Sequence, residues 1–316
     1  MYYKWENNSM KIATTTGDFN FYCKTDEERI RELHRAGFRY IDLNLYNFKP
    51  DCAYMQDNWK EPVQKLKDLA EELGMQFVQA HSQGGNSLKD DPEHVDFLIK
   101  ATIRSIEICQ MLGIKNTVVH SGAQLGIEKD EWFDKNKKFY AKLFPAMEEC
   151  GVNVLCENGT KVNAPGCYFL FNGNDMYDFI KYVDHPQFHG CWDTGHANIE
   201  GPQYDEILAL KDELYAIHYH DNHNFRDDHL APFLGRMNHD EIMQALLDVG
   251  YKGYFTLEAD SSLVKYQQWT EWRRQFEKGT KELRLCEPQL FMQRHIEAMM
   301  YDTAKWMLES YDVFEE

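Results

Sequence analysis

Six short hydrophobic segments of this 316-residue chain each end in a side chain that can bind a metal ion or transfer a proton. A single histidine or carboxylate at such a position is usually structural. However, charged side chains are rarely buried without a partner or a cation, so six in succession predict a metal site with acid–base chemistry. In chain order these residues are His81, His120, Glu157, Asp193 with His196 across a predicted tight turn, His218 with His220, and Glu258 with Asp260.

The last four of these segments supply the predicted metal ligands, which are Glu157, Asp193, His218 and Glu258. Three carboxylates and one imidazole form an oxygen-rich set, which suits Mn²⁺ or Mg²⁺ and also accepts Co²⁺ or Zn²⁺. His218 and His220 share the same strand parity, so both can point inward. We assign His218 as the ligand and His220 to the substrate or to the shell around the ligands. Asp221 is predicted to orient the imidazole of His218.

The six segments belong to a regular alternation of β-rich runs with longer amphipathic stretches. Strands separated by helices must run parallel and be covered on both faces. Eight such units predict a (β/α)8 TIM barrel of the α/β class, whose active site lies at the C-terminal ends of the strands. A doubly wound sheet is the alternative, but Thr14-Thr-Thr-Gly17 is a poor phosphate loop after the first strand. The predicted strands are 11–16, 40–45, 77–81, 117–120, 152–157, 188–193, 214–220 and 254–258.

Local signals mark the helix boundaries. Thr25-Asp-Glu-Glu28 is a capping-box pattern, and glycine follows five of the helices at the position that favours a left-handed backbone. A single helix is predicted over 132–150. We predict one domain over 1–316, with an insertion over 261–288 after strand eight and the eighth helix at 289–309. The insertion is interpreted as a partial lid or an assembly surface, and an amphipathic helix packed on the outside of the barrel is the alternative.

Composition narrows the classes of partner. A hydrophobic content of 43% supports a large core, and the net charge of −18 argues against nucleic acid, which needs clustered lysine and arginine. The eight cysteines show no metal or disulfide spacing, and no segment resembles a signal peptide or a membrane span. These features predict a cytoplasmic protein without a membrane partner. A homo-oligomer, or a complex with a second subunit, is expected.

Five motifs follow one another at the strand ends: Glu157-Asn, Asp193-x-x-His196, His218-x-x-Asp221, Asp227-Asp-His229-Leu and Thr-Leu-Glu258. In this order they resemble the xylose isomerase-like TIM barrel superfamily over roughly residues 11–260. By this resemblance, the four predicted metal ligands match the single-metal site of ketose 3-epimerases, in which the two glutamates also act as acid and base. His196 matches a substrate-binding histidine, and Arg226 matches a substrate-contacting arginine at a spacing two residues longer.

The same resemblance extends to the zinc-dependent AP endonucleases of type IV. The positions that match the extra ligands of their three-zinc cluster are His81, His120, His196, Asp227 and His229. The acidic chain and the absence of a basic, aromatic-bearing strip argue against this alternative. One departure from the family pattern affects both the epimerase and the endonuclease resemblance, because the usual Pro-Gly-x-Gly is here Pro232-Phe-Leu-Gly235.

The favoured interpretation is a divalent-metal-dependent isomerase or epimerase of a sugar, sugar phosphate or polyol. It would work by α-proton transfer through a metal-stabilised enediolate, with Glu157 and Glu258 as the catalytic pair. One alternative is a lyase on the same site that cleaves an oxidised C-glycoside with a partner subunit. Another is a multi-zinc phosphodiesterase of the AP endonuclease type, with Asp227 and His229 as extra ligands. The predicted substrate-binding residues are His81, His120, His196, His220, Arg226 and His229.

Overall fold

Eight parallel strands form a barrel in the computed structural model, which describes residues 9–263, 277–278, 281–282 and 288–316. The strands pair in the order β7-β6-β5-β4-β3-β2-β1-β8, and a bridge between Tyr219 and Leu257 joins the two ends of this sheet. The predicted (β/α)8 barrel is confirmed. The strands are β1 Ile12–Thr15, β2 Tyr40–Asn44, β3 Gln76–His81, β4 Asn116–Val118, β5 Asn153–Glu157, β6 Phe188–Asp193, β7 Leu214–His218 and β8 Phe255–Leu257.

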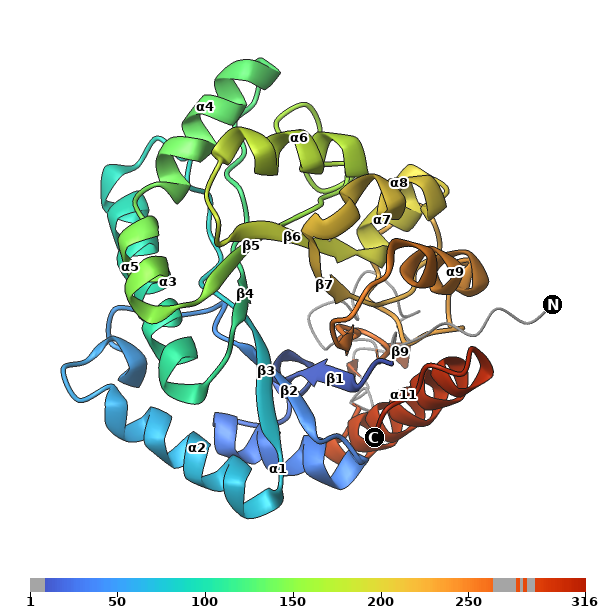
Figure 1. Ribbon diagram of the computed structural model, residues 1–316. Helices are drawn as coiled ribbons and strands as arrows, with labels where there is room; N and C mark the ends of the chain where they lie inside the picture. Colours follow the sequence, from blue (N-terminus) through green and yellow to red (C-terminus); the bar gives the residue numbers. More distant parts are fainter. Residues whose placement is uncertain (1–8, 264–276, 279–280, 283–287) are drawn as a thin grey trace.

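The helices surround the strands as an outer ring (Figure 1). The last of them, α11, packs beside α1 and covers the side of the barrel next to β1. The larger helices are α1 Asp26–Ala36, α2 Lys60–Leu73, α3 Pro92–Leu112, α4 Lys129–Tyr140, α6 Gly173–Val183, α9 His239–Val249 and α11 Leu290–Ser310. Shorter helices are α5 Phe144–Cys150, α7 Thr194–Glu200 and α8 Tyr204–Leu210, with 3-10 turns η1 Thr16–Phe19, η2 Ala53–Met55 and η3 Lys211–Glu213.

Capping explains why these helices begin and end where they do. Thr25 and Glu28 form the reciprocal capping box at the start of α1. Asp91 accepts the backbone N–H of His94 at the start of α3, where Pro92 occupies a position that needs no N–H partner. Left-handed glycines end α1, α2, α3, α5 and α9, as the sequence predicts.

Two predicted elements are wrong in detail. The expected helix over 132–150 is two helices, α4 and α5, because Pro145 cannot donate to the carbonyl of Ala141 and the chain turns before it. The segment after Asp193 was expected to be a tight turn, but it is the helix α7. Asp193 caps this helix by accepting the N–H of His196 at 2.6 Å.

The interior of the barrel differs from one side to the other. A small apolar cluster from β4 to β7 fills one side and consists of Val118, Leu155, Cys191 and Ala216. The other side carries buried polar side chains, among them Asp42 on β2, Gln79 on β3 and Thr256 on β8. This polar side lies next to His218, as described below.

Most of the predicted insertion over 261–288 lies outside the described residues. The structure shows a short antiparallel pair there, β9 Glu277–Lys278 with β10 Lys281–Glu282. A lid or assembly role for 261–288 stays a prediction. Of the cysteines that the structure describes, seven are free thiols, and no described helix is long and apolar enough to cross a membrane.

Candidate active site

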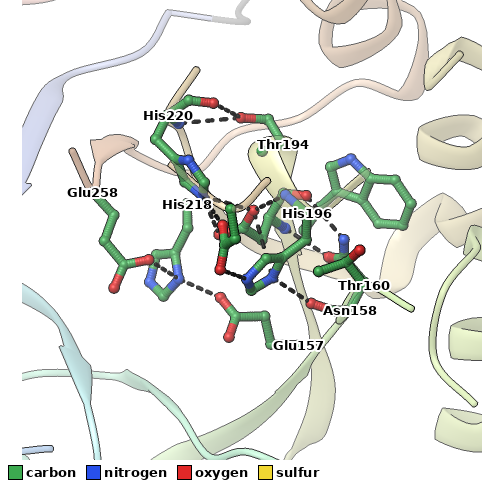
Figure 2. Close-up of polar contacts among 12 residues, drawn as sticks. Glu157, Asn158, Thr160, Thr194, His196, His218, His220 and Glu258 are labelled. Atoms are coloured by element: carbon green, nitrogen blue, oxygen red, sulfur yellow. Dashed lines mark hydrogen bonds and ion pairs between the residues drawn. The ribbon is translucent and has the colours of Figure 1, made fainter. Parts of the chain in front are cut away.

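Four side chains from neighbouring strand ends meet at one end of the barrel. Glu157 ends β5, Asp193 ends β6, His218 ends β7, and Glu258 follows β8. Each offers a ligand atom, and these atoms all lie within 4.8 Å of one another. Glu157 and Glu258 point toward His218 (Figure 2), whose Nδ1 contacts Glu157 and lies 3.2 Å from Oε2 of Glu258. The structure therefore brings together the predicted metal set.

The chemistry of this set fits a divalent cation. Three carboxylates converge at a site where the side chains of Glu157, Asp193 and His218 are almost wholly shielded from solvent. Burial opposes ionisation of Glu157, but His218 and His120 outweigh it and hold the pKa of this carboxyl well below its usual range. Burial raises the pKa of Glu258, with a further contribution from the charge of Glu157. A cation would relieve this crowding of like charges.

A second group of ligands lies on the other side of Glu157. His120 Nε2 is 2.7 Å from Oε2 of Glu157 and 3.1 Å from His81 Nε2. His81 Nδ1 donates to the backbone oxygen of Ser82 at 3.2 Å, so its Nε2 faces the site as an acceptor. Burial and the neighbouring His120 lower the pKa of His81 to about 3, which keeps this imidazole neutral. The ring of Tyr46 packs edge-on against both histidines.

A third group gathers around Asp227, which contacts His196 at 3.1 Å and His229 at 3.3 Å through their Nε2 atoms. Both histidines donate Nδ1–H to backbone oxygens, His196 to Asn158 at 2.8 Å and His229 to Glu258 at 3.0 Å. A carbonyl oxygen can only accept, so Nδ1 of each ring carries a proton and Nε2 is the nitrogen directed toward Asp227. His220 completes the group, with its Nε2 3.0 Å from Asp193.

A cavity of about 510 Å³ opens above these groups. Seven of the predicted site residues line it: His81, His120, Glu157, His196, Asp227, His229 and Glu258. Asp193, His218 and His220 are fully buried and are not part of the described cavity wall. Arg226 is also not in that wall, and its guanidinium lies 3.6 Å from Asp228.

Sequence reasoning gave no role to Asn158, which ties two strand ends together. Its side-chain oxygen accepts the N–H of Asp193 at 2.6 Å, and its amide donates to the Asp193 carbonyl at 2.9 Å. Its own carbonyl accepts from His196. The sequence feature that could have identified Asn158 is its position directly after Glu157. Asn44, Asn86 and Tyr168 also line the cavity and went unnoticed, because amide and phenol side chains are common in loops.

The prediction that Asp221 orients His218 is wrong. The carboxylate of Asp221 accepts the backbone N–H groups of Gly235 at 2.8 Å and Met237 at 2.9 Å. It lies in the long loop after β7 and is engaged in shaping that loop. Phe233 in the same loop adopts a φ of 69°, a left-handed conformation that favours glycine. Phenylalanine therefore adopts a left-handed backbone at a position where the family motif has glycine.

Known proteins resemble this chain in sequence and in fold. A family model described as xylose isomerase-like TIM barrel matches residues 30–284. A D-psicose 3-epimerase from Enterocloster bolteae is 25% identical over 242 residues, which cover 72% of this chain and 74% of that protein.

Two solved structures have the same fold. A crystal structure of a D-tagatose 3-epimerase-like protein matches with a TM-score of 0.72 at 17% identity, over 96% of this chain and 98% of that one. A 3-keto-D-glucoside 4-epimerase from E. coli matches with a TM-score of 0.65 at 18% identity, over 82% of this chain and 95% of that one. At these identities the structural likeness establishes the fold.

Proposed function

Because this chain belongs to the xylose isomerase-like TIM barrel family, we propose that it is a divalent-metal-dependent sugar isomerase or epimerase. The observation that carries the proposal is the pair of glutamates, Glu157 and Glu258, which flank His218 and line the same cavity. Two carboxylates around one substrate carbon are the arrangement that proton removal and return require. The sugar epimerases among the similar proteins support the same activity.

Glu157, Asp193, His218 and Glu258 would hold the cation, with Mn²⁺ or Mg²⁺ preferred for an oxygen-rich set. When bound, such a cation acidifies the C–H next to a carbonyl and stabilises the enediolate that forms. One glutamate takes the proton from that carbon. The other delivers a proton to the opposite face in an epimerase or to the adjacent carbon in an isomerase.

The remaining cavity residues would bind and orient the sugar. His81 and His120 lie beside Glu157, and the Nε2 of His81, which faces the site as an acceptor, can accept from a sugar hydroxyl. His196 and His229 line the opposite side with Asp227. The volume of about 510 Å³ falls within the range of small-molecule sites. His220 is proposed to support Asp193 rather than to contact the sugar, because it is buried against that carboxylate.

Exchange of a substrate hydrogen with solvent tests the proposal without knowledge of the product. The metal-free protein would be loaded with Mn²⁺ and incubated in D₂O with a panel of ketoses, ketose phosphates and polyols. We expect deuterium to enter one C–H position of at least one ketose, detected by NMR. Glu258→Gln should abolish the exchange, whereas Glu131→Gln, on the exposed face of α4, should not. The absence of exchange for every compound, with protein that binds Mn²⁺, would refute the proposal.

Phosphodiester hydrolysis is a second candidate, which the group around Asp227 favours. His196 and His229 each use Nδ1 for a backbone oxygen and direct Nε2 toward one shared carboxylate, as in a second metal site. Metal analysis separates the candidates. One metal per chain after dialysis supports the isomerase, whereas about three zinc ions per chain with cleavage of bis(p-nitrophenyl) phosphate supports the hydrolase.

A further inference from the structure

Asp42 is a fully buried carboxylate in the middle of β2, inside the barrel. Neither of its oxygens has a hydrogen-bond partner among the described residues. Its Oδ2 lies 3.8 Å from Nε2 of His218, and that nitrogen also lacks a partner in the described part of the chain. Buried polar groups are nearly always paired, because an unmade hydrogen bond leaves the loss of hydration uncompensated. Two unpaired groups that face each other require an explanation.

The orientation of His218 explains why these two groups face each other. Its Nδ1 faces Glu157 and Glu258, the side on which the cation would bind, so its Nε2 points away into the barrel. A histidine that binds a metal through one nitrogen carries its proton on the other, and this N–H almost always donates to a carboxylate or a carbonyl. Asp42 is the carboxylate that lies on that side, whereas Asp221 is engaged with the loop after β7.

The surroundings of Asp42 favour an acceptor role. Gln79 is its register partner on β3, and the buried side-chain nitrogen of Gln79 has no partner in the part of the chain that the structure describes. Thr256 donates to the Gln79 oxygen at 3.4 Å. The amide of Gln79 is thus oriented with its N–H groups available to a neighbouring acceptor. The thiol of Cys191 also lies near His218, but burial raises its pKa to about 12, and a neutral thiol is a weak acceptor.

We propose that Asp42 is a positioning residue, which accepts the Nε2–H of His218 and fixes the imidazole with Nδ1 toward the cation. The separation of 3.8 Å is about 1 Å longer than an ordinary N–H···O bond, so a small side-chain movement completes it. The inference rests on the proposed metal set. It adds a residue on β2, on the opposite side of the barrel, to a site otherwise built from β5 to β8.

The test is the affinity of the metal-free, full-length protein for MnCl₂, measured by calorimetric titration. Asp42→Asn should weaken Mn²⁺ binding by about 10–100-fold, because a neutral amide is a poorer acceptor and can present its own N–H groups to the ring. Glu297→Gln is the matched control. Glu297 is another fully buried carboxyl, and one of its oxygens has no partner among the residues that the structure describes, but it lies on α11 beside Gln293. We expect this control to bind Mn²⁺ within about twofold of the wild type.

The results for the two variants and for the wild type contradict different parts of the proposal. Equal affinity of wild type and a folded Asp42→Asn variant would overturn the role of Asp42 while the metal set stands. An equal loss in Glu297→Gln would overturn it too, since the effect would then belong to any buried carboxyl group. A wild-type protein that binds no divalent cation would overturn both the inference and the proposed function.

A second measurement does not depend on the folding of an Asp42 variant. In ¹⁵N-histidine-labelled protein loaded with Zn²⁺, which is diamagnetic, the ring of His218 is identified by its absence from the spectrum of His218→Gln. We expect its Nε2 to carry the proton and its Nδ1 to be the bound nitrogen. The opposite tautomer would overturn the proposal.

Discussion

Glu157 is shared between two groups of side chains, and this makes it the central residue of the site. One of its oxygens contacts His218 and the other contacts His120. These histidines hold its pKa well below the usual range in spite of burial, so Glu157 is ionised at neutral pH. A residue in this position can serve as ligand, as base and as the link between the two groups.

Replacement of this residue is therefore expected to have two effects. Glu157→Gln should lower kcat for the exchange reaction by at least about 10²–10⁴-fold, since it removes an acid–base group, and should also reduce bound metal. Activity at saturating Mn²⁺ and metal content by elemental analysis give the two readings, with circular dichroism to confirm the fold. A kcat within tenfold of the wild type would contradict the catalytic role.

The ion pairs around Asp227 predict how the metal-free protein responds to pH. Burial alone would lower the pKa of His196, but Asp193 and Asp227 outweigh it and raise the pKa to about 10. A raised pKa stabilises the fold below the unfolded value of about 6.5, and this contribution is lost as the pH rises from there through about 10.

Thermal unfolding in EDTA between pH 6 and 10.5 measures this effect. The melting temperature of the wild type should fall over this range, and Asp227→Asn should flatten the fall because its amide no longer stabilises the charged imidazole. A parallel pH dependence in both proteins would show that the Asp227 pairs contribute nothing measurable.

At the scale of elements, Asp193 has a structural task as well as its place in the metal set. Its Oδ1 caps α7, and its Oδ2 accepts from His220. Helix α7 was missed because the sequence Asp193-Thr-Gly-His196 reads as a turn, and glycine near a helix start weakens the helical pattern. The caps of α1 and the glycine ends of five helices were predictable, since those signals lie within a few residues of each other.

Two substitutions separate these tasks. Asp193→Asn keeps a good cap and loses the charge, so the metal-free protein should keep a melting temperature near that of the wild type while Mn²⁺ affinity falls. Asp193→Ala loses both and should cost about 1 kcal/mol more in the free energy of unfolding. Denaturant unfolding and calorimetric titration give both values. Equal stabilities of the two variants would show that the cap contributes little.

For the whole molecule, the alternation of eight strands with helices was sufficient to predict the barrel and the convergence of the strand ends. Glu157, Asp193, His218 and Glu258 could be predicted to converge because the C-terminal ends of parallel strands share one rim. Asp42 could not, because its partner His218 stands far along the chain, and only the closed barrel brings them together. The same holds for Asn158, whose role depends on the register of β5 with β6.

The barrel is joined between β7 and β8 by little backbone pairing. Among the described residues, two backbone hydrogen bonds cross this seam, from Tyr219 N–H to the oxygen of Thr256 at 2.8 Å and from Glu258 N–H to the oxygen of Tyr219 at 3.1 Å. His218 and Glu258, two members of the metal set, lie on opposite sides of the seam. A cation held by both side chains would cross-link the ends of β7 and β8, and would act as a clasp between these two strands.

This clasp should be visible in the backbone amides. Addition of Mn²⁺ is expected to slow hydrogen–deuterium exchange of peptides containing Tyr219 and Glu258 more than that of peptides from α2, which lies on the outer ring away from the seam. Uniform slowing would indicate general stabilisation without a clasp. If the seam is protected in this way, the ion that activates the substrate also stabilises the junction of β7 and β8. Removal of the ion by a chelator would then make the barrel more mobile at the active site.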